Sequence, residues 1–230
     1  HGMVPQSDVV FENLGDGTFQ DVTASWGFTT TPAFALNVAI LDVTGDGFVD
    51  VFVGNDSMSN SLYVNAGKSN AVFKEVGLQS GIALNGDGAM QATMGIAIAD
   101  VNGNKRPDIF TTNFSSDTNT LHLNDESGFF DDRTQRYRLG LSSRSLLGWS
   151  CGFYDFDLDG DEDLLIVNGH VYPEATSETM DSERAQPMVL FERTTTGFSK
   201  VKDDSSSLLF DPHRDRAAVF GDIDNDGDTD

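Results

Sequence analysis

Residues 155–163 read DFDLDGDED, which places six acidic side chains within nine positions. Carboxylates this close together repel one another unless a cation or solvent screens them. The stretch begins like an EF-hand calcium loop, but that loop requires a glutamate at position 12, where this chain has Ile166. An EF-hand is therefore excluded. A solvated acidic turn and a different kind of cation-binding loop remain as alternatives.

The same nine-residue pattern occurs three more times along the chain. The copies are DVTGDGFVD at 42–50, DVNGNKRPD at 100–108 and DIDNDGDTD at 222–230. They recur at intervals of about 60 residues, which is a period typical of repeat architectures. Four copies in register make a purely solvated turn the weaker alternative, so the pattern predicts a repeated structural unit.

Each repeat contains runs of apolar residues that predict β-strands. A short apolar run precedes every acidic stretch, and the three internal stretches are followed by a second run, VFVGN, IFTTN or LLIVN. Later in each period two strand-like runs flank a turn, as in TLHLNDESGFF at 120–130, where Gly and Asn allow the positive φ of a hairpin. Each period therefore predicts four short antiparallel strands, with the acidic stretch between the first and the second.

Four-stranded units repeated in this way favour a β-propeller, because a single sheet cannot bury both of its faces and must stack against its neighbours. We predict an all-β fold in which residues 1–230 form one partial propeller. The expected blades span 1–33 (incomplete), 34–91, 92–147, 148–214 and 215–230 (incomplete). A ring of seven such blades takes roughly 420 residues, so we expect the remaining blades to come from a longer chain.

One phenylalanine position recurs in the second hairpin of each period and predicts part of the core. These residues are Phe19, Phe73, Phe130 and Phe198.

The acidic stretches carry the ligands that a hard cation prefers. Oxygen-bearing side chains stand at positions 1, 3, 5 and 9, and position 6 is glycine in three of the four copies. Ca²⁺ takes six to eight oxygen ligands at about 2.3–2.6 Å, and the carbonyl at position 7 adds another oxygen. The stretches therefore predict calcium loops that connect strands.

The repeats resemble the FG-GAP/VCBS repeat family, whose propeller blades carry D-x-D-x-D-G-x-x-D calcium loops between their first two strands. More narrowly, MGIAIADVNGNKRPDIFTTNFSSDTNTL, GWSCGFYDFDLDGDEDLLIVNGHVYP and AAVFGDIDNDGDTD resemble the bacterial CRTAC1-like proteins. In those proteins an ASPIC/UnbV domain typically follows the propeller. The resemblance implies a calcium-binding propeller that is secreted or displayed at the cell surface.

The family pattern, transferred position by position, implies up to four Ca²⁺ sites. They comprise Asp42, Thr44, Asp46, Phe48 and Asp50; Asp100, Asn102, Asn104, Arg106 and Asp108; Asp155, Asp157, Asp159, Asp161 and Asp163; and Asp222, Asp224, Asp226, Asp228 and Asp230, where the position-7 residue contributes its carbonyl.

The four sites are not expected to be equal, because affinity rises with the charge of the ligands. Their side-chain carboxylates at positions 1, 3, 5 and 9 number three, two, four and four. We expect the third site to bind most tightly and the second most weakly. The second has Lys105 in place of glycine, with Arg106 beside it, so it is either empty or has a basic side chain in place of the ion.

The overall charge limits the partners. The chain has 14 basic and 37 acidic residues and a net charge of −23, which repels nucleic acid and anionic lipid. No apolar run of about 18 residues is present, so membrane insertion is not expected. The single cysteine, Cys151, excludes an intramolecular disulfide.

One stretch matches a catalytic motif but lies in the wrong structural context. Gly148–Gly152, GWSCG, fits the G-x-S-x-G nucleophile elbow, which needs a strand followed by a helix. The repeat register places it at the start of a first strand, where Cys151 is expected to pack as a small apolar side chain. The four histidines show no metal-binding spacing. We therefore predict no catalytic residues and no organic cofactor.

These patterns predict a non-enzymatic, extracytoplasmic scaffold for binding, adhesion or assembly, with a protein or glycan ligand. Calcium near millimolar levels outside the cytoplasm fills weak loops that cytosolic levels leave empty. The alternatives are a polysaccharide-binding or carbohydrate-active propeller and a structural subunit of a surface layer or filament. Two long loops, 80–92 and 171–187, are the candidates for ligand contact. Trp26, Trp149, Tyr172 and the many phenylalanines are candidates for a sugar-stacking platform, but such residues more often form the core between blades.

Overall fold

The structure, a computed structural model, describes residues 3–29, 31–67, 72–202 and 210–227. Its strands form one two-stranded and three four-stranded sheets, all antiparallel, so the predicted all-β architecture of four-stranded blades is confirmed. The sheets consist of β1 (Phe11–Asn13) and β2 (Phe19–Asp21); β3 (Ala35–Leu41), β4 (Asp50–Asn55), β5 (Ser61–Asn65) and β6 (Phe73–Glu75); β7 (Ile96–Ala99), β8 (Asp108–Thr111), β9 (Thr120–Asn124) and β10 (Phe130–Asp132); and β11 (Gly148–Tyr154), β12 (Asp163–Asn168), β13 (Val189–Thr194) and β14 (Gly197–Lys200).

Helical segments are short in the described part of the chain. They are α1 (Gly77–Ser80), α2 (Ser177–Met180) and the single 3₁₀ turn η1 (Leu141–Ser143). None of the helices in this part has the length and apolar character needed to cross a bilayer.

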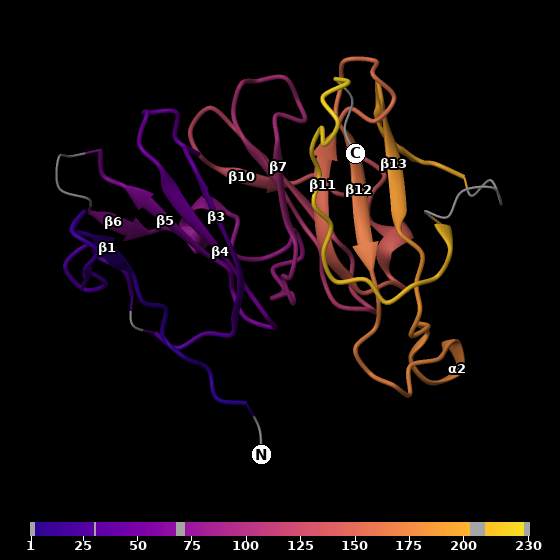
Figure 1. The fold of residues 1–230 in the computed structure, drawn as a ribbon, viewed down its shortest axis with the longest axis horizontal. Coiled ribbons are helices and arrows are strands. Elements are labelled where there is room, and N and C mark those ends of the chain that lie inside the picture. Colours follow the sequence, from indigo (N-terminus) through magenta and orange to yellow (C-terminus); the bar gives the residue numbers. More distant parts are fainter. Residues whose placement is uncertain (1–2, 30, 68–71, 203–209, 228–230) are drawn as a thin grey trace.

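Within each four-stranded sheet, strands that follow one another in sequence are hydrogen-bonded neighbours. The three sheets lie side by side in chain order, from β3–β6 through β7–β10 to β11–β14 (Figure 1). Their first strands face one another, because β3 contacts β7 and β7 contacts β11. This is the arrangement of consecutive propeller blades around an axis.

Apolar side chains from adjacent sheets form the core. Phe110 and Leu121 of the β7–β10 sheet pack in one cluster with Phe153 and Phe191 of the β11–β14 sheet. A second cluster joins the β3–β6 and β7–β10 sheets, and a third joins β3–β6 to the segment around Phe28. Burial between sheets therefore stabilises the repeat order, since each sheet covers a face of the next.

Backbone hydrogen bonds also connect adjacent sheets at a repeated position. The carbonyl of an asparagine at or just after the end of each second strand accepts an N–H from the chain leading into the next sheet or repeat. The three bonds are Thr93 N to Asn55 O at 3.0 Å, Gly148 N to Asn113 O at 3.2 Å and Asp215 N to Asn168 O at 3.3 Å. The donors all precede the following acidic stretch by the same number of residues, so the connection is a property of the repeat.

The phenylalanine position predicted to be core is buried in three of its four copies. Phe73, Phe130 and Phe198 are buried at the starts of the fourth strands. Phe19 is 64% exposed, so the prediction is wrong for this residue. Phe19 belongs to the β1–β2 hairpin, whose sheet has only two strands instead of the four of the other sheets.

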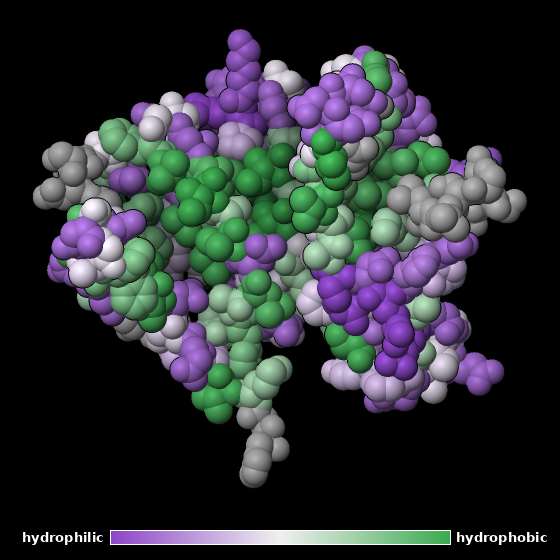
Figure 2. All heavy atoms as spheres, viewed as in Figure 1, coloured by the Kyte–Doolittle hydropathy of each residue, from purple (hydrophilic) through white to green (hydrophobic). Residues whose placement is uncertain are grey.

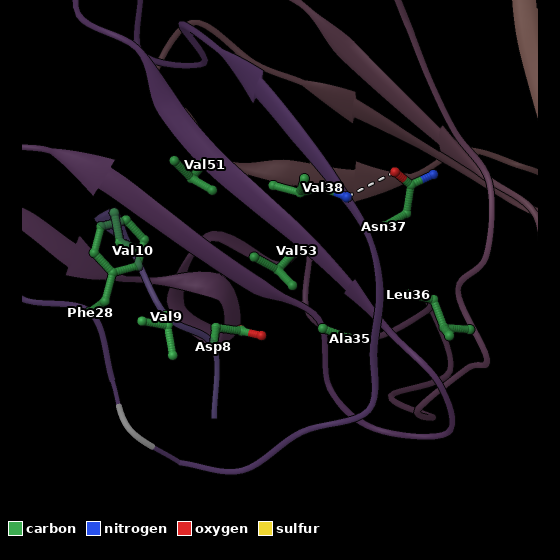
Figure 3. A pocket seen from close by; sticks show the side chains of 10 residues that line it. All are labelled: Asp8, Val9, Val10, Phe28, Ala35, Leu36, Asn37, Val38, Val51 and Val53. Atoms are coloured by element: carbon green, nitrogen blue, oxygen red, sulfur yellow. Dashed lines mark hydrogen bonds between the residues drawn. The ribbon is translucent and has the colours of Figure 1, made fainter. Parts of the chain in front are cut away.

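The face of β3 that points away from β7 is open in the described structure. Leu36, Val38 and Ile40 are at least half exposed there. Val38 lies with Val51, Val53 and Phe28 around an apolar cavity of about 400 Å³ (Figure 3). The segment 8–10 closes one side of this cavity, so β1 and the residues before it cover the sheet only in part.

Candidate metal centres

The first three acidic stretches lie where the repeats predicted them, between the first and second strands of the four-stranded sheets. Residues 42–49 join β3 to β4, 100–107 join β7 to β8, and 155–162 join β11 to β12. The same strand pairing closes each connection: Leu41 pairs with Asp50, Ala99 with Asp108 and Tyr154 with Asp163. The position-9 aspartate is thus the first residue of each second strand.

The aspartate at position 1 organises all four loops in the same way. One carboxylate oxygen accepts the N–H of position 5 and the other accepts the N–H of position 6. The pairs of donors are Asp46 and Gly47 for Asp42, at 3.2 and 2.8 Å; Asn104 and Lys105 for Asp100, at 2.9 and 2.7 Å; Asp159 and Gly160 for Asp155, both at 3.0 Å; and Asp226 and Gly227 for Asp222, both at 3.1 Å. The fourth stretch therefore has the loop conformation of the others, although residues 210–227 contain no strand.

The backbone is left-handed at positions 4 and 6 of every loop. The φ angles at position 4 are 72° at Gly45, 74° at Gly103, 61° at Leu158 and 62° at Asn225. At position 6 they are 87° at Gly47, 66° at Lys105 and 98° at both Gly160 and Gly227. Glycine adopts this region without steric cost. Lys105 adopts it despite its side chain, so the departure of the second loop from the glycine pattern does not change its fold.

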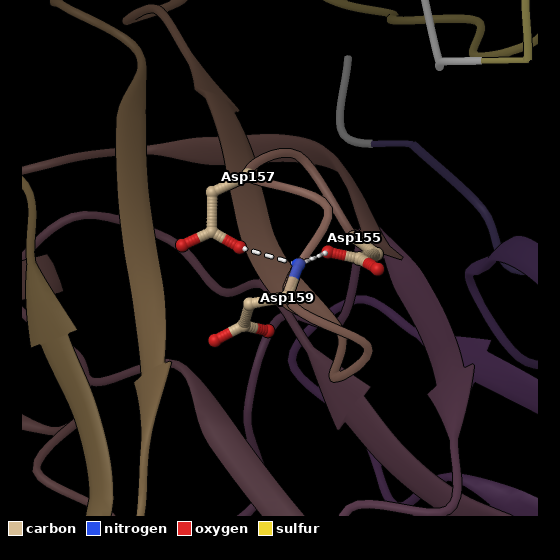
Figure 4. A group of neighbouring side chains, drawn as sticks. All are labelled: Asp155, Asp157 and Asp159. Atoms are coloured by element: carbon tan, nitrogen blue, oxygen red, sulfur yellow. Dashed lines mark hydrogen bonds between the residues drawn. The ribbon is translucent and has the colours of Figure 1, made fainter.

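In the third loop the fold gathers three carboxylates from alternate positions. Oxygens of Asp155, Asp157 and Asp159 lie within 4.8 Å of one another, and the side chains turn toward a common region (Figure 4). Two ligands on opposite sides of one Ca²⁺ at about 2.4 Å are separated by about this distance, so the group fits the ion. Burial and the charge of Asp159 raise the pKa of Asp161, against the influence of Arg193, which is consistent with local negative potential.

The fourth loop gathers its carboxylates in the same way. Asp222, Asp224 and Asp226 also lie within 4.8 Å of one another. Two further predicted ligands of this loop, Asp228 and Asp230, lie outside the described residues.

The first two loops have the same backbone but fewer charges. Thr44 donates its hydroxyl to Asp42 at 3.3 Å. In the second loop the Asn104 side-chain amide donates to the carbonyl of Asn124 at 2.8 Å, so its amide nitrogen already has a hydrogen-bond partner. A neutral oxygen replaces a carboxylate at position 3 of the first loop and at positions 3 and 5 of the second, which is the basis of the expected order of affinity.

The basic residues of the second loop do not take the place of an ion beside its acids. In the described part of the chain the one ion pair joins Arg133 to Asp131, so neither Lys105 nor Arg106 pairs with Asp100 or Asp108. Arg106 instead extends toward Glu126 O, 3.5 Å away, and its guanidinium lies against Gly45 of the first loop. The hypothesis of a substituting cation therefore finds no support in this geometry.

The aspartate at position 9 has a structural role that the sequence did not reveal. One of its oxygens accepts the N–H of position 2 in its own loop, and the other accepts an N–H from the third strand of the sheet or its end. The donors are Val43 and Asn65 for Asp50, Val101 and Asn124 for Asp108, and Phe156 and Arg193 for Asp163, at 2.8–3.2 Å. Asp163 does not belong to the group formed by Asp155, Asp157 and Asp159.

Burial distinguishes the position-9 carboxyl groups from the exposed acids of the loops. All three side chains are buried. Desolvation raises the pKa of Asp50 and Asp163 above the usual value, and it raises the pKa of Asp108 to about 6, although two backbone N–H groups oppose the shift in each case. These carboxyl groups support the base of each loop, and in the described structure their oxygens accept hydrogen bonds from backbone N–H groups.

Two of the other signals in the sequence also have a structural explanation. GWSCG lies entirely within β11, with no helix after it, so Ser150 is not on a nucleophile elbow. Cys151 belongs to the core, and burial raises the pKa of its thiol. His122 and His170 are buried in different repeats. Among the described residues, three or more His, Cys, Asp or Glu side chains come close enough together to share a metal ion in the two aspartate groups alone.

Comparison with known proteins identifies the repeat. The profile of the FG-GAP-like repeat matches residues 4–53, 42–111 and 100–166, which together cover more than half of the chain. The chain belongs to the FG-GAP-like repeat family. Successive matches begin at Asp42 and Asp100, the first residues of two loops. No curated protein matches the chain. The FG-GAP-like loop geometry continues beyond the last match, since Asp222 makes the same hydrogen bonds as Asp155.

Proposed function

We propose that this FG-GAP-like chain is a non-enzymatic binding scaffold stabilised by calcium in its strand-connecting loops. The observation that carries the proposal is the geometry of the loops: in all four the position-1 aspartate fixes the turn, and in the third and fourth alternate acids converge. Like charges held this close repel one another, and a bound cation relieves the repulsion. Bound Ca²⁺ supplies that compensation, and its binding energy contributes to folding because the unfolded chain has no formed site.

Different residues would hold the ion in each loop. In the third and fourth loops Asp155, Asp157 and Asp159, and Asp222, Asp224 and Asp226, would provide the carboxylates. The first loop would rely on Asp42 and Asp46, and the second on Asp100 with neutral oxygens. The third loop is therefore expected to bind most tightly and the second most weakly. The carbonyls of position 7 remain proposed ligands.

The proposed setting is extracytoplasmic. Loops that lack the full ligand set of an EF-hand are filled where calcium is near millimolar, and this favours a secreted, periplasmic or cell-surface protein. The net charge of −23 makes nucleic acid an unfavourable partner. The resemblance to bacterial CRTAC1-like proteins supports the same setting and a longer chain with further blades.

Thermal unfolding with and without calcium tests the proposal. A site filled at 100 times its dissociation constant contributes about 2.7 kcal/mol, which corresponds to roughly 5–10 °C in melting temperature for a chain of this size. We expect calcium to raise the melting temperature and a chelator to reverse the effect. Asp157→Asn should remove part of the calcium-dependent increase.

The matched control is Asp181→Asn. Asp181 is exposed, lies outside the loops and has a left-handed backbone that asparagine tolerates. Asp181→Asn makes the same change in charge and should leave the calcium response intact. Structural calcium in the third loop would be refuted by a melting temperature that changes with neither calcium nor chelator. It would also be refuted if Asp157→Asn and Asp181→Asn showed the same calcium-dependent increase.

A further inference from the structure

A pocket lined by basic residues lies at the opposite end of the third four-stranded sheet from its acidic loop. Three segments surround it: 169–171, which follows β12; 184–185, which precedes β13; and 212–216. The cavity is about 550 Å³, within the range of small-molecule sites. In Figure 1 the yellow C-terminal segment crosses below β12, and Figure 2 shows strongly hydrophilic residues gathered in that region.

The charge of this pocket contrasts with the rest of the chain. Arg184, Arg214 and Arg216 line it together with His170 and His213, although the chain has only 14 lysines and arginines in all. Asp215 is the one acidic residue in the lining, and Glu174 lies near enough to influence His170. Counting the arginines and Asp215 alone, the lining has a positive formal charge within a chain of net charge −23.

The arginines are not neutralised within the described structure. The ion pair between Arg133 and Asp131 lies elsewhere, and it is the one that the described residues form. Arg216 donates to the carbonyls of Gly169 at 2.9 Å and His170 at 3.3 Å, and its guanidinium lies 4.9 Å from the centre of the Trp149 ring. Neutral carbonyls and an aromatic face hold this guanidinium in place and leave its charge available.

The three segments are fixed to one another by hydrogen bonds. His170 N donates to Arg184 O at 3.0 Å, and Gln186 and His213 exchange backbone hydrogen bonds of 2.7 and 3.0 Å. A Cβ on Gly169 would lie 2.6 Å from Arg216 Nη1 and 2.9 Å from Arg214 Cα, so glycine permits the close approach. The positions of the arginines therefore follow from backbone contacts between distant parts of the chain.

His170 shapes the pocket and does not add to its charge. The N–H of Tyr172 donates to its Nδ1 at 3.2 Å, so the ring proton is on Nε2, which donates to Ser115 Oγ at 3.1 Å. Burial and the charge of Arg216 lower the pKa of His170, while Glu174 opposes the shift. The ring also contacts Tyr172, a 46% exposed residue that follows the segment 169–171 and is not itself part of the lining.

We propose that this pocket binds the carboxylate of an acidic sugar residue. Arginine forms paired hydrogen bonds with carboxylates, and the size of the cavity suits one or two sugar rings. The amphipathic ring of Tyr172 can cover the apolar face of a sugar while the guanidinium groups hold its charge. The inference deepens the proposed scaffold function, on which it rests, by naming a ligand class and placing it away from the calcium loops.

Calorimetric titration of the calcium-loaded protein tests the inference. The probes are glucuronate, glucose as its neutral counterpart, and inorganic phosphate as an oxyanion without a sugar. We expect saturable binding of glucuronate at least tenfold tighter than that of glucose or phosphate. Arg214→Gln and Arg184→Gln should each weaken glucuronate binding at least tenfold. Arg136→Gln changes an exposed arginine that is not part of the pocket lining and should have no effect.

The calcium loops provide the second control, because a uronate can also contact a bound cation. Asp157→Asn should lower the calcium-dependent stability and leave glucuronate binding unchanged. The arginine variants should weaken glucuronate binding and leave the calcium-dependent stability unchanged. No binding of glucuronate, equal binding of glucose, or equal loss in Arg136→Gln would overturn the pocket assignment. Phosphate binding tighter than glucuronate would overturn the acidic-sugar assignment. Neither result bears on structural calcium, which the unfolding experiment measures separately.

Discussion

The side-chain amide of Asn124 donates a hydrogen bond of 2.8 Å to the carbonyl of Val43, 81 residues earlier in the chain. Asn124 ends the third strand of one sheet, and Val43 is the second residue of the acidic loop of the preceding sheet. Arg193 repeats the relationship one blade later, because its Nη2 donates to Val101 O at 2.7 Å. The first and second loops are thus each connected to their own sheet through position 9 and to the next sheet through position 2.

Loss of the Asn124 side chain should therefore destabilise the contact between two blades as well as one loop. Asn124 is buried, and its removal leaves the Val43 carbonyl without this donor. We expect Asn124→Ala to lower the free energy of unfolding by about 1–3 kcal/mol, the usual cost of an unsatisfied buried polar group. Urea denaturation measures the change. Asn13→Ala, at an exposed position, should cost less, and equal losses would contradict the inter-blade role.

Two glycines at position 4 allow the packing of Arg106 to be separated from backbone strain. Gly45 and Gly103 have φ angles of 72° and 74°. A Cβ on Gly103 meets no atom within 4 Å, whereas a Cβ on Gly45 overlaps the guanidinium of Arg106. We expect Gly103→Ala to cost on the order of 1 kcal/mol from the left-handed backbone, and Gly45→Ala to cost more.

The additional cost at Gly45 should disappear when Arg106 is shortened. A double-mutant cycle of Gly45→Ala and Arg106→Ala, followed by urea unfolding, measures this coupling. A coupling energy indistinguishable from zero would show that Arg106 moves aside without loss and that only the backbone angle requires glycine.

The four acidic copies made the strand order and the loop positions predictable, because spacing and alternation are local properties of the sequence. The same regularity led to the wrong expectation for Phe19, since burial depends on which sheets surround a residue and not on its repeat position alone. The bond from Asn124 to Val43 and the grouping of Arg184 with Arg214 join segments far apart in the chain. No local pattern in the sequence predicts such contacts. Glycine or asparagine at position 4 in three loops was the available signal for the left-handed backbone.

The buried carboxyl group of Asp108 should make stability depend on pH in the absence of calcium. Its pKa in the folded chain is about 6, mainly because of burial, against an ordinary value of 3.8. Between these values the folded chain holds a proton that the unfolded chain has lost. The contribution of this group is therefore fully present below about pH 4 and is lost as the pH rises through about 6.

The measurement compares the wild type with Asp108→Asn in chelator from pH 4 to 7. The two oxygens of Asp108 accept hydrogen bonds from backbone N–H groups, so Asp108→Asn should destabilise the fold by an amount that does not depend on pH. The test is therefore the change with pH in the stability difference between the wild type and the variant. Relative to the variant, the wild type should lose on the order of 2–3 kcal/mol across the range. Parallel pH profiles, or a carboxyl resonance that titrates near 4 by NMR, would contradict the raised pKa.

The second loop should gain calcium affinity when its sequence is converted toward that of the third. Asn102→Asp adds a carboxylate at position 3, and Lys105→Gly removes a positive charge and the side chain at a left-handed position with a φ of 66°. Asn104 is kept, because its amide bonds to Asn124 O at 2.8 Å and supports the loop. Since affinity rises with ligand charge, we expect the double variant to bind Ca²⁺ at this loop at least tenfold more tightly than the wild type. Calorimetry with Asp157→Asn and Asp224→Asn in the background, which weaken the third and fourth loops, isolates the change. Asn13→Asp controls for added charge alone. An affinity gain in Asn13→Asp equal to that of the double variant would mean that the loop geometry contributes nothing and that net charge accounts for the binding.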